Sequence, residues 1–241
     1  MRISEIADYD KKRKKVILEE GAESFLLYLG ELRRLRLRAE EDLSEAQYQA
    51  IVQDILIPRA RKKALYLLKD SDRTKAQVTR KLREGLYPQA VIDDVLAFLE
   101  AHQFVDDSRY AERYVEALKE KRSKREIAAK LYQRGIQREA AAEQLDELTE
   151  EDERGACLRV LRQQYGRKLM QAAETLEELE EAGLLTGRYG AGEDAEEGAE
   201  RAAEQRAEAL ALRRRAYAYL ARRGFSHDSI NYAFLHLQEE M

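Results

Sequence analysis

Two adjacent aspartates, Asp106 and Asp107, form a carboxylate pair whose position could support chemistry. They lie in FVDDSRYAERYV (104–115), between an apolar pair and a segment with helical periodicity. Such a pair can bind a metal ion, act as acid and base, or cap a helix. A metal or catalytic role would need further ligands, and the chain has no HxxxH, HExxH, CxxC or DxDxDG pattern. We therefore predict that Asp106 is a helix N-cap and that Asp107 lies in the first helical turn, where the helix dipole favours negative charge.

The other groups with reactive potential are scattered along the chain. His102, His227 and His236 are isolated from one another, and no phosphate-binding loop or GxGxxG pattern is present. The single cysteine, Cys157, lies in an apolar helical pattern, which is typical of a small buried residue rather than a nucleophile. It excludes an internal disulfide and fits a reducing cytosol. The sequence predicts no catalytic residue, no metal site, no cofactor and no enzymatic activity.

The composition favours a mainly α fold. Charged residues make up 37% of the 241 residues, and the chain has only two prolines and twelve glycines. Ala, Leu, Glu, Arg, Lys and Gln dominate, and all are good helix formers. The N-terminus lacks the apolar stretch of a signal peptide, and the longest apolar run, FLLYL, is too short to cross a bilayer. We expect a cytoplasmic protein that does not enter the membrane.

The N-terminal segment, residues 1–40, has a different pattern from the rest. ISEIA alternates apolar and polar residues, KKVILEE has a β-branched centre, and SFLLYL follows Gly21. These features predict a small β segment of about three strands, with Gly21 in a turn. Ser44 then has the position of an N-cap, with Gln47 three residues later, which predicts a linking helix within 41–61.

An internal repeat occupies the remainder of the chain. Residues 81–96, 130–145 and 219–234 align around a glycine that is preceded by a leucine and followed by an apolar residue. A helix can end at this glycine in the left-handed conformation, and a second helix can start after the polar stretch that follows. With the apolar helix upstream, each unit is predicted to be a three-helix repeat, over 62–105, 106–149 and 150–241.

The third repeat carries an acidic insert at about 167–207. The stretch is rich in Ala and Glu and is interrupted by Gly183, Gly187, Gly190 and Gly192. We predict two helical arms joined by a mobile loop, placed between the first and second helices of the repeat. Two roles stay open for the insert, a contact with a partner and a solvated extension.

Two stretches carry a resemblance to a known family. The run GLYPQAVIDDVLAFLEAHQFVDDSRYAERYV resembles the central motif of RecX proteins, and YLARRGFSHDSINYAF resembles the closing signature of that family. The N-terminal segment with KKRKKVILEEG is similar to an extension of longer members. The resemblance covers nearly all of 1–165 and 208–238, and the insert departs from it. The residues that form the structural motif are Gly85, Asp106, Asp107, Arg109, Tyr110, Gly135, Gly224 and Phe225.

The resemblance implies a fold and a function. It implies tandem three-helix repeats in an elongated, curved molecule that binds within the groove of the RecA filament on single-stranded DNA. There the family mostly inhibits RecA ATP hydrolysis, strand exchange and co-protease activity, which restrains homologous recombination and the SOS response. We expect a monomer with the RecA filament as its partner, no membrane, and possible weak direct binding of DNA.

Local basic character is compatible with such a partner. Residues 58–85 hold ten Lys/Arg against three Asp/Glu, and residues 119–138 hold eight against two. Basic side chains on several modules can form an extended positive stripe. The candidate residues for RecA or DNA are Arg80, Lys81, Arg83, Lys121, Arg122, Lys124, Arg125, Lys130, Arg134, Arg213, Arg214, Arg215, Arg222 and Arg223.

Alternatives to this interpretation remain. The basic residues could form a solvated face with ordinary ion pairs. The three-helix units could also be direct DNA-binding modules of the helix-turn-helix kind. The KKRKK run at 11–15 could contact phosphate or protect an edge strand from aggregation. Four tyrosines could stack on bases, although their helical spacing favours packing: Tyr110, Tyr114, Tyr132 and Tyr217.

Overall fold

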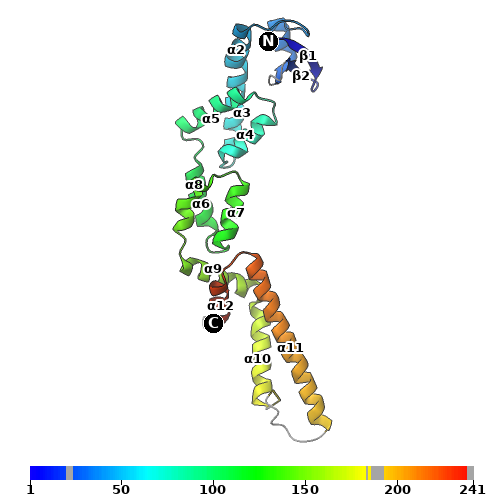
Figure 1. The fold of residues 1–241 in the computed structure, drawn as a ribbon, viewed down its shortest axis with the longest axis vertical. Helices are drawn as coiled ribbons and strands as arrows, with labels where there is room; N and C mark the ends of the chain where they lie inside the picture. The colour runs from blue at the N-terminus through cyan, green and yellow to red at the C-terminus, as the bar shows by residue number, and fades with distance from the viewer. Residues whose placement is uncertain (20–23, 183, 186–192, 238–241) are drawn as a thin grey trace. The chain divides into compact units, whose positions relative to one another are not determined.

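The chain is mainly helical, with a small antiparallel sheet at its N-terminus, which confirms the predicted fold class (Figure 1). The structure is a computed structural model that describes residues 1–19, 24–182, 184–185 and 193–237. The chain divides into two compact units. The first comprises residues 1–111 and 132–140, and the second comprises residues 112–131 and 141–241.

The sheet has three strands in the order β1-β2-β3, and each neighbouring pair is antiparallel. Ile6 faces Val16 between the first two strands, and Val16 faces Phe25 between the next two. β-Branched and aromatic residues favour such a pleated, half-buried surface. The predicted turn at Gly21 lies outside the described residues. The strands are β1 (Ile3–Asp8), β2 (Arg13–Leu18) and β3 (Phe25–Tyr28).

A long helix connects the sheet to the first repeat. Its start confirms the predicted cap: the N–H of Gln47 donates to Ser44 Oγ (3.2 Å), and the N–H of Ser44 donates to Gln47 Oε1 (2.9 Å). The helix continues through the position predicted to separate the linking helix from the repeat. A π-helical turn interrupts it and ends two residues before Pro58, which has no N–H and so removes one hydrogen bond of the helix. Its parts are α2 (Glu45–Ile51), η1 (Val52–Leu56) and α3 (Ile57–Lys69), and α1 (Leu29–Leu35) precedes it.

The sheet and the first repeat share one hydrophobic core. Phe25 of β3, Leu56 of η1, Leu82 of α4 and Val95 of α5 are buried in the same cluster. Burial of large apolar side chains is the main stabilising contribution to such a core. The sheet therefore rests on the repeat rather than standing alone. The second and third helices of the repeat are α4 (Lys75–Arg83) and α5 (Gln89–Ala101).

The second repeat is divided between the two units. Residues 107–111 and 132–140 belong to the first unit, and most of the remaining residues belong to the second. Ala111, Ile127 and Leu131 are each buried. Its helices are α6 (Asp107–Leu118), α7 (Lys124–Gln133) and α8 (Arg138–Asp146).

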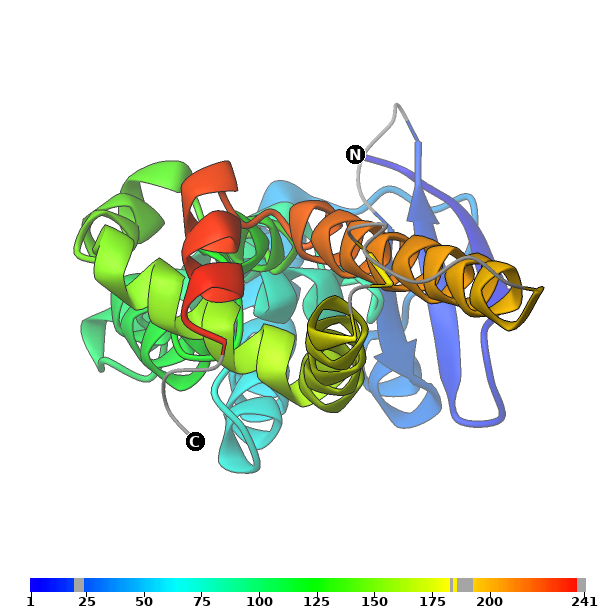
Figure 2. The same ribbon diagram turned by 90° about the horizontal axis from the view of Figure 1, so that it is seen from below.

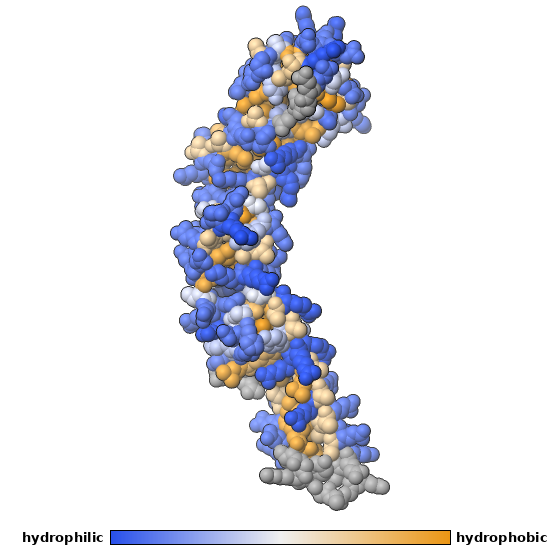
Figure 3. Space-filling view, in the orientation of Figure 1, coloured by the Kyte–Doolittle hydropathy of each residue, from blue (hydrophilic) through white to orange (hydrophobic). Residues whose placement is uncertain are grey.

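The third repeat has long first and second helices because the insert extends both. α10 continues α9 through a second π-helical turn, and both ribbon views show α10 and α11 side by side (Figures 1 and 2). The predicted helical arms are confirmed, and most of the predicted loop lies outside the described residues. Figure 3 shows a largely hydrophilic surface with apolar strips along this pair of helices. The elements are α9 (Glu150–Leu161), η2 (Arg162–Gly166), α10 (Arg167–Glu181), α11 (Glu193–Arg222) and α12 (His227–Leu235).

No helix among the described residues is both long enough and apolar enough to span a bilayer. In the same part of the chain, no group of three or more His, Cys, Asp or Glu residues could hold a metal ion.

Candidate partner-binding surface and the joints between repeats

The aspartate pair caps two different helices. Asp106 Oδ1 accepts the N–H of Arg109 (3.0 Å), the contact expected of an N-cap on α6. Asp107 Oδ1 accepts the N–H of Lys75 (3.0 Å), the first residue of α4. Burial raises the pKa of the Asp107 carboxyl, although the hydrogen bond and the charge of Lys75 oppose the increase. Sequence reasoning missed this contact because the two residues lie in different repeats.

The first joint between repeats is built on a buried threonine. Thr74 Oγ1 accepts the N–H of Gln77 (3.1 Å) at the start of α4 and donates its proton to the carbonyl of Arg134 (2.6 Å). Gly135 follows with a φ of +82°, and a Cβ there would lie 2.2 Å from the Cβ of Ala76. The repeat glycine is therefore needed for the helix end and for the close approach of the next repeat.

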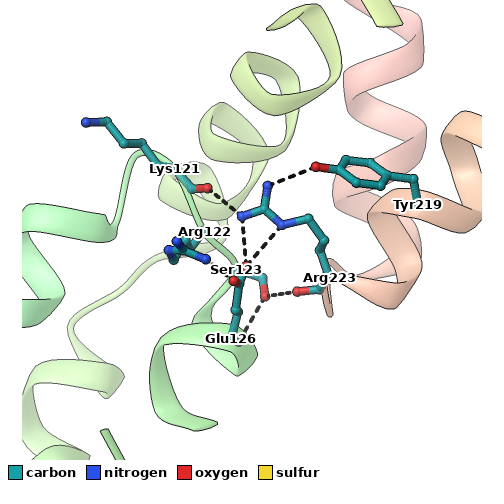
Figure 4. Close-up of polar contacts among 6 residues, drawn as sticks. All are labelled: Lys121, Arg122, Ser123, Glu126, Tyr219 and Arg223. Atoms are coloured by element: carbon teal, nitrogen blue, oxygen red, sulfur yellow. Dashed lines mark hydrogen bonds and ion pairs between the residues drawn. The ribbon is translucent and has the colours of Figure 1, made fainter. Parts of the chain in front are cut away.

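The second joint repeats this arrangement with a serine (Figure 4). The buried Ser123 accepts the N–H of Glu126 (3.1 Å) at the start of α7 and donates to the carbonyl of Arg223 (2.6 Å). Gly224 has a φ of +83°, and a Cβ there would lie 3.1 Å from the Cβ of Arg125. In both joints one hydroxyl caps a helix and also binds the carbonyl before the glycine of the following repeat.

Glu126 gathers two guanidinium groups beside the second joint (Figure 4). Arg223 donates to Glu126 Oε2 through Nη2 (2.8 Å) and to the carbonyl of Lys121 (3.0 Å), and Arg122 forms an ion pair with the other carboxylate oxygen. Burial opposes the charge of Arg223, but hydrogen bonds to Glu126 and Tyr219 outweigh it, so the pKa of Arg223 is raised. These two arginines of the predicted stripe therefore already have an anionic partner within the chain.

The predicted cations divide into two groups according to their partners. Four of them bind carboxylates of the same chain: Lys81 with Glu84, Arg122 and Arg223 with Glu126, and Lys124 with Asp146. Arg134 donates to the hydroxyl of Tyr110 (2.7 Å). The others have no carboxylate within 4.0 Å among the described residues: Arg80, Arg83, Lys121, Arg125, Lys130, Arg213, Arg214, Arg215 and Arg222.

The unpaired cations recur on the second helix of each repeat. Arg80 lies on α4, Arg125 and Lys130 lie on α7, and Arg214 lies on α11. Of these, Arg80, Arg125 and Arg214 are exposed, and Lys130 is half-buried. A surface cation without an internal carboxylate can bind an external anion directly. A paired cation must first break its internal ion pair.

The remaining motif residues have structural positions. Arg109 donates to the carbonyl of Gln103 (3.0 Å), and Phe225 is buried in the core of the third repeat. Gly85 has no positive φ, and a Cβ there would lie 2.5 Å from Lys63 Nζ. Sequence reasoning also missed Thr74 and Ser123. Both stand at the same distance before the repeat leucine of their helix, a pattern that a search for hydroxyl caps could have found.

Comparison with known proteins matches the repeats one by one. The family model of the first three-helix domain of RecX matches residues 60–99, and that of the second three-helix domain matches residues 106–145. In both of these domains the chain matches the RecX family.

Two relatives named regulatory protein RecX illustrate the similarity. The protein of Clostridium acetobutylicum is 31% identical over 105 residues, which are 44% of this chain and 49% of the relative. The protein of Clostridium tetani is 26% identical over 162 residues, which are 67% of this chain and 74% of the relative. The alignment thus spans about half of the first relative and three quarters of the second.

Two solved structures of RecX proteins share the fold. A crystal structure of regulatory protein RecX aligns over 100% of both chains with a TM-score of 0.52 and 21% identity. The RecX structure from Lactobacillus salivarius aligns over 76% of this chain and 97% of its own, with a TM-score of 0.53 and 18% identity.

Proposed function

We propose that this chain binds the RecA filament on single-stranded DNA and restrains its ATP hydrolysis, strand exchange and co-protease activity. The similarity to proteins named regulatory protein RecX supports a regulatory role. The observation that carries the proposal is the recurrence of unpaired cations on α4, α7 and α11, one helix in each repeat. Several weak contacts on tandem modules strengthen one another because each bound module raises the effective concentration of the next.

The test is the rate of ATP hydrolysis by the cognate RecA on single-stranded DNA, titrated with this chain below one copy per RecA. A progressive loss of hydrolysis supports the proposal. Unchanged hydrolysis at an excess of the chain contradicts it, and steeply salt-dependent binding to naked DNA with sequence preference would then favour a direct DNA-binding protein.

Charge reversal identifies the contacts. Arg80→Glu and Arg214→Glu change unpaired cations of α4 and α11, and Lys121→Glu changes one that lies three residues before α7, so the fold should be retained. Each contact of this kind contributes about 0.5–1 kcal/mol, so the triple variant should raise the half-inhibitory concentration roughly 10- to 100-fold. Arg34→Glu, which changes an exposed cation of α1 by the same charge, is the matched control.

Arg122, Lys124 and Arg223 are poor choices for this experiment, although the sequence includes them in the stripe. Each has a carboxylate partner within the chain, and reversal at Arg122 or Arg223 would place a negative charge against Glu126. Loss of inhibition by such a variant would report on the joint rather than on the filament.

A further inference from the structure

A pocket of about 490 Å³ lies within the first unit, between the sheet, α3 and the turn that joins α4 to α5. Arg13 of β2, Tyr28 of β3, Lys62 and Tyr66 of α3, and Tyr87 of the turn contribute to its wall. Basic and aromatic side chains therefore share one concave surface. Its volume is within the range of about 300–1,000 Å³ that is typical of small-ligand sites and accommodates a nucleotide.

Two of the four cations in the pocket are already neutralised. Arg13 forms an ion pair with Asp10 (2.6 Å). Arg59 forms an ion pair with Glu31, and its guanidinium lies 4.7 Å from the centre of the Tyr28 ring. These arginines stabilise the wall of the pocket through internal ion pairs and are therefore less available to bind a ligand.

The two lysines of the pocket are not neutralised. Lys62 is exposed and Lys63 is half-buried, and neither has a carboxylate within 4.0 Å in the part of the chain that the structure describes. Burial and the charge of Arg13 lower the pKa of Lys63, although Glu84 opposes this. An anion that entered the pocket would stabilise the half-buried ammonium group of Lys63, which Arg13 repels.

The turn of the α4–α5 connection is shaped around Lys63. Its ammonium lies 5.5 Å from the centre of the Tyr87 ring. A Cβ at Gly85 would lie 2.5 Å from Lys63 Nζ and 3.0 Å from Tyr87 Cε2. Glycine at this position therefore leaves the space in which the ammonium sits.

Tyr66 supplies an aromatic face next to these charges. Its side chain is 70% exposed, and it has no ring contact and no hydrogen bond among the described residues. Residues four apart lie on the same helix face, so Tyr66 stands beside Lys62 on α3. A large exposed ring beside unpaired ammonium groups suits a single-stranded nucleic acid. A base can stack on the ring, and the phosphates can bind the ammonium groups.

We infer that this pocket binds single-stranded nucleic acid, with one base stacked on Tyr66 and adjoining phosphates on Lys62 and Lys63. An acidic peptide would use the lysines and leave the ring without a role. The inference goes beyond the proposed function, because it concerns a free strand and a surface outside the unpaired cations of α4, α7 and α11.

The experiment measures binding of the full chain to a short fluorescent oligothymidylate by anisotropy, without RecA and at several salt concentrations. Tyr66→Ala should weaken binding roughly 5- to 100-fold, whereas Tyr66→Phe, which keeps the ring, should bind like the wild type. Lys62→Gln and Lys63→Gln should each reduce the slope of log affinity against log salt by about 0.7. Lys69→Gln, an exposed lysine on α3 outside the pocket, is the control and should change neither quantity.

Three results would overturn the inference: no binding of the oligonucleotide, binding that Tyr66→Ala leaves intact, or a polyglutamate peptide that competes equally well. The last would make the pocket a peptide site. Assays of RecA ATP hydrolysis with the same variants separate the two proposals. Lost oligonucleotide binding with intact inhibition leaves the filament proposal standing, and intact oligonucleotide binding without inhibition by the wild type contradicts the filament proposal alone.

Discussion

Gly135→Ala should destabilise the first joint far more than Gly224→Ala destabilises the second. Both glycines have a positive φ, of +82° and +83°, and an L-residue in that conformation costs about 1–2 kcal/mol. The surroundings differ. The new Cβ at 135 would lie 2.2 Å from the Cβ of Ala76, next to a helix backbone, whereas the nearest atoms at 224 are 3.1 Å away and include the flexible side chain of Arg125.

Overpacking of this kind costs about 1–3 kcal/mol beyond the backbone term. If the joint opens to relieve it, the buried hydroxyl of Thr74 loses its acceptor, at a similar cost. We therefore expect Gly135→Ala to lower the free energy of unfolding by about 2–5 kcal/mol, against about 1–2 kcal/mol for Gly224→Ala.

The assay is urea-induced unfolding, combined with hydrogen exchange at the amide of Gln77, which binds the Thr74 hydroxyl. Adding Ala76→Gly to Gly135→Ala removes the close contact and should recover the steric part, once the helix cost of Ala76→Gly, measured in the single variant, is subtracted. Equal effects of the two glycine substitutions, or no recovery in the double variant, would refute the reasoning.

Three further predictions concern single side chains. Ser123→Ala removes a cap and a joint contact and should cost about 1–2 kcal/mol in urea unfolding, whereas Ser123→Thr, which matches the first joint, should cost less. The raised pKa of Asp107 means that the folded chain binds this proton more tightly than the unfolded chain does. Protonation of Asp107 therefore stabilises the fold. This stabilisation is fully present below the usual pKa of 3.8 and is lost as the pH rises through the raised pKa. Asp107→Asn keeps the acceptor oxygen and should flatten that pH dependence of the urea midpoint without loss of stability at neutral pH; a loss would contradict it. Burial raises the pKa of the Cys157 thiol to about 12, so modification by iodoacetamide should be slow in the folded chain and follow its unfolding rate; fast labelling of the native chain would show the thiol to be accessible.

The sequence predicts the elements of this fold well because their determinants are local. The strands follow from alternation, the capping box of Ser44 and Gln47 from spacing, and the repeats from the glycines at their helix ends. Each of these signals lies within a few residues of the structure that it specifies.

The partners of individual side chains are harder to predict because they come from distant parts of the chain. Glu126 binds Arg223, 97 residues away, so the local count of basic residues overstates the free charge of the second repeat. Asp107 reaches Lys75, 32 residues away, across a repeat boundary. The pocket beside Tyr66 likewise needs the sheet, α3 and the α4–α5 turn to come together. Hydrophobic periodicity in the sequence does not specify contacts between residues that are so far apart along the chain.

The joints have a consequence for synthesis on the ribosome. Thr74 needs the carbonyl of Arg134, which is made 60 residues later, and Ser123 needs that of Arg223, 100 residues later. The first and second repeats therefore each emerge with a cap whose second partner has not yet been synthesised, and each reaches its final stability only when the following repeat has been translated. The acidic insert lengthens the second of these intervals. More of the chain must therefore be translated before the second repeat is stabilised than before the first repeat is.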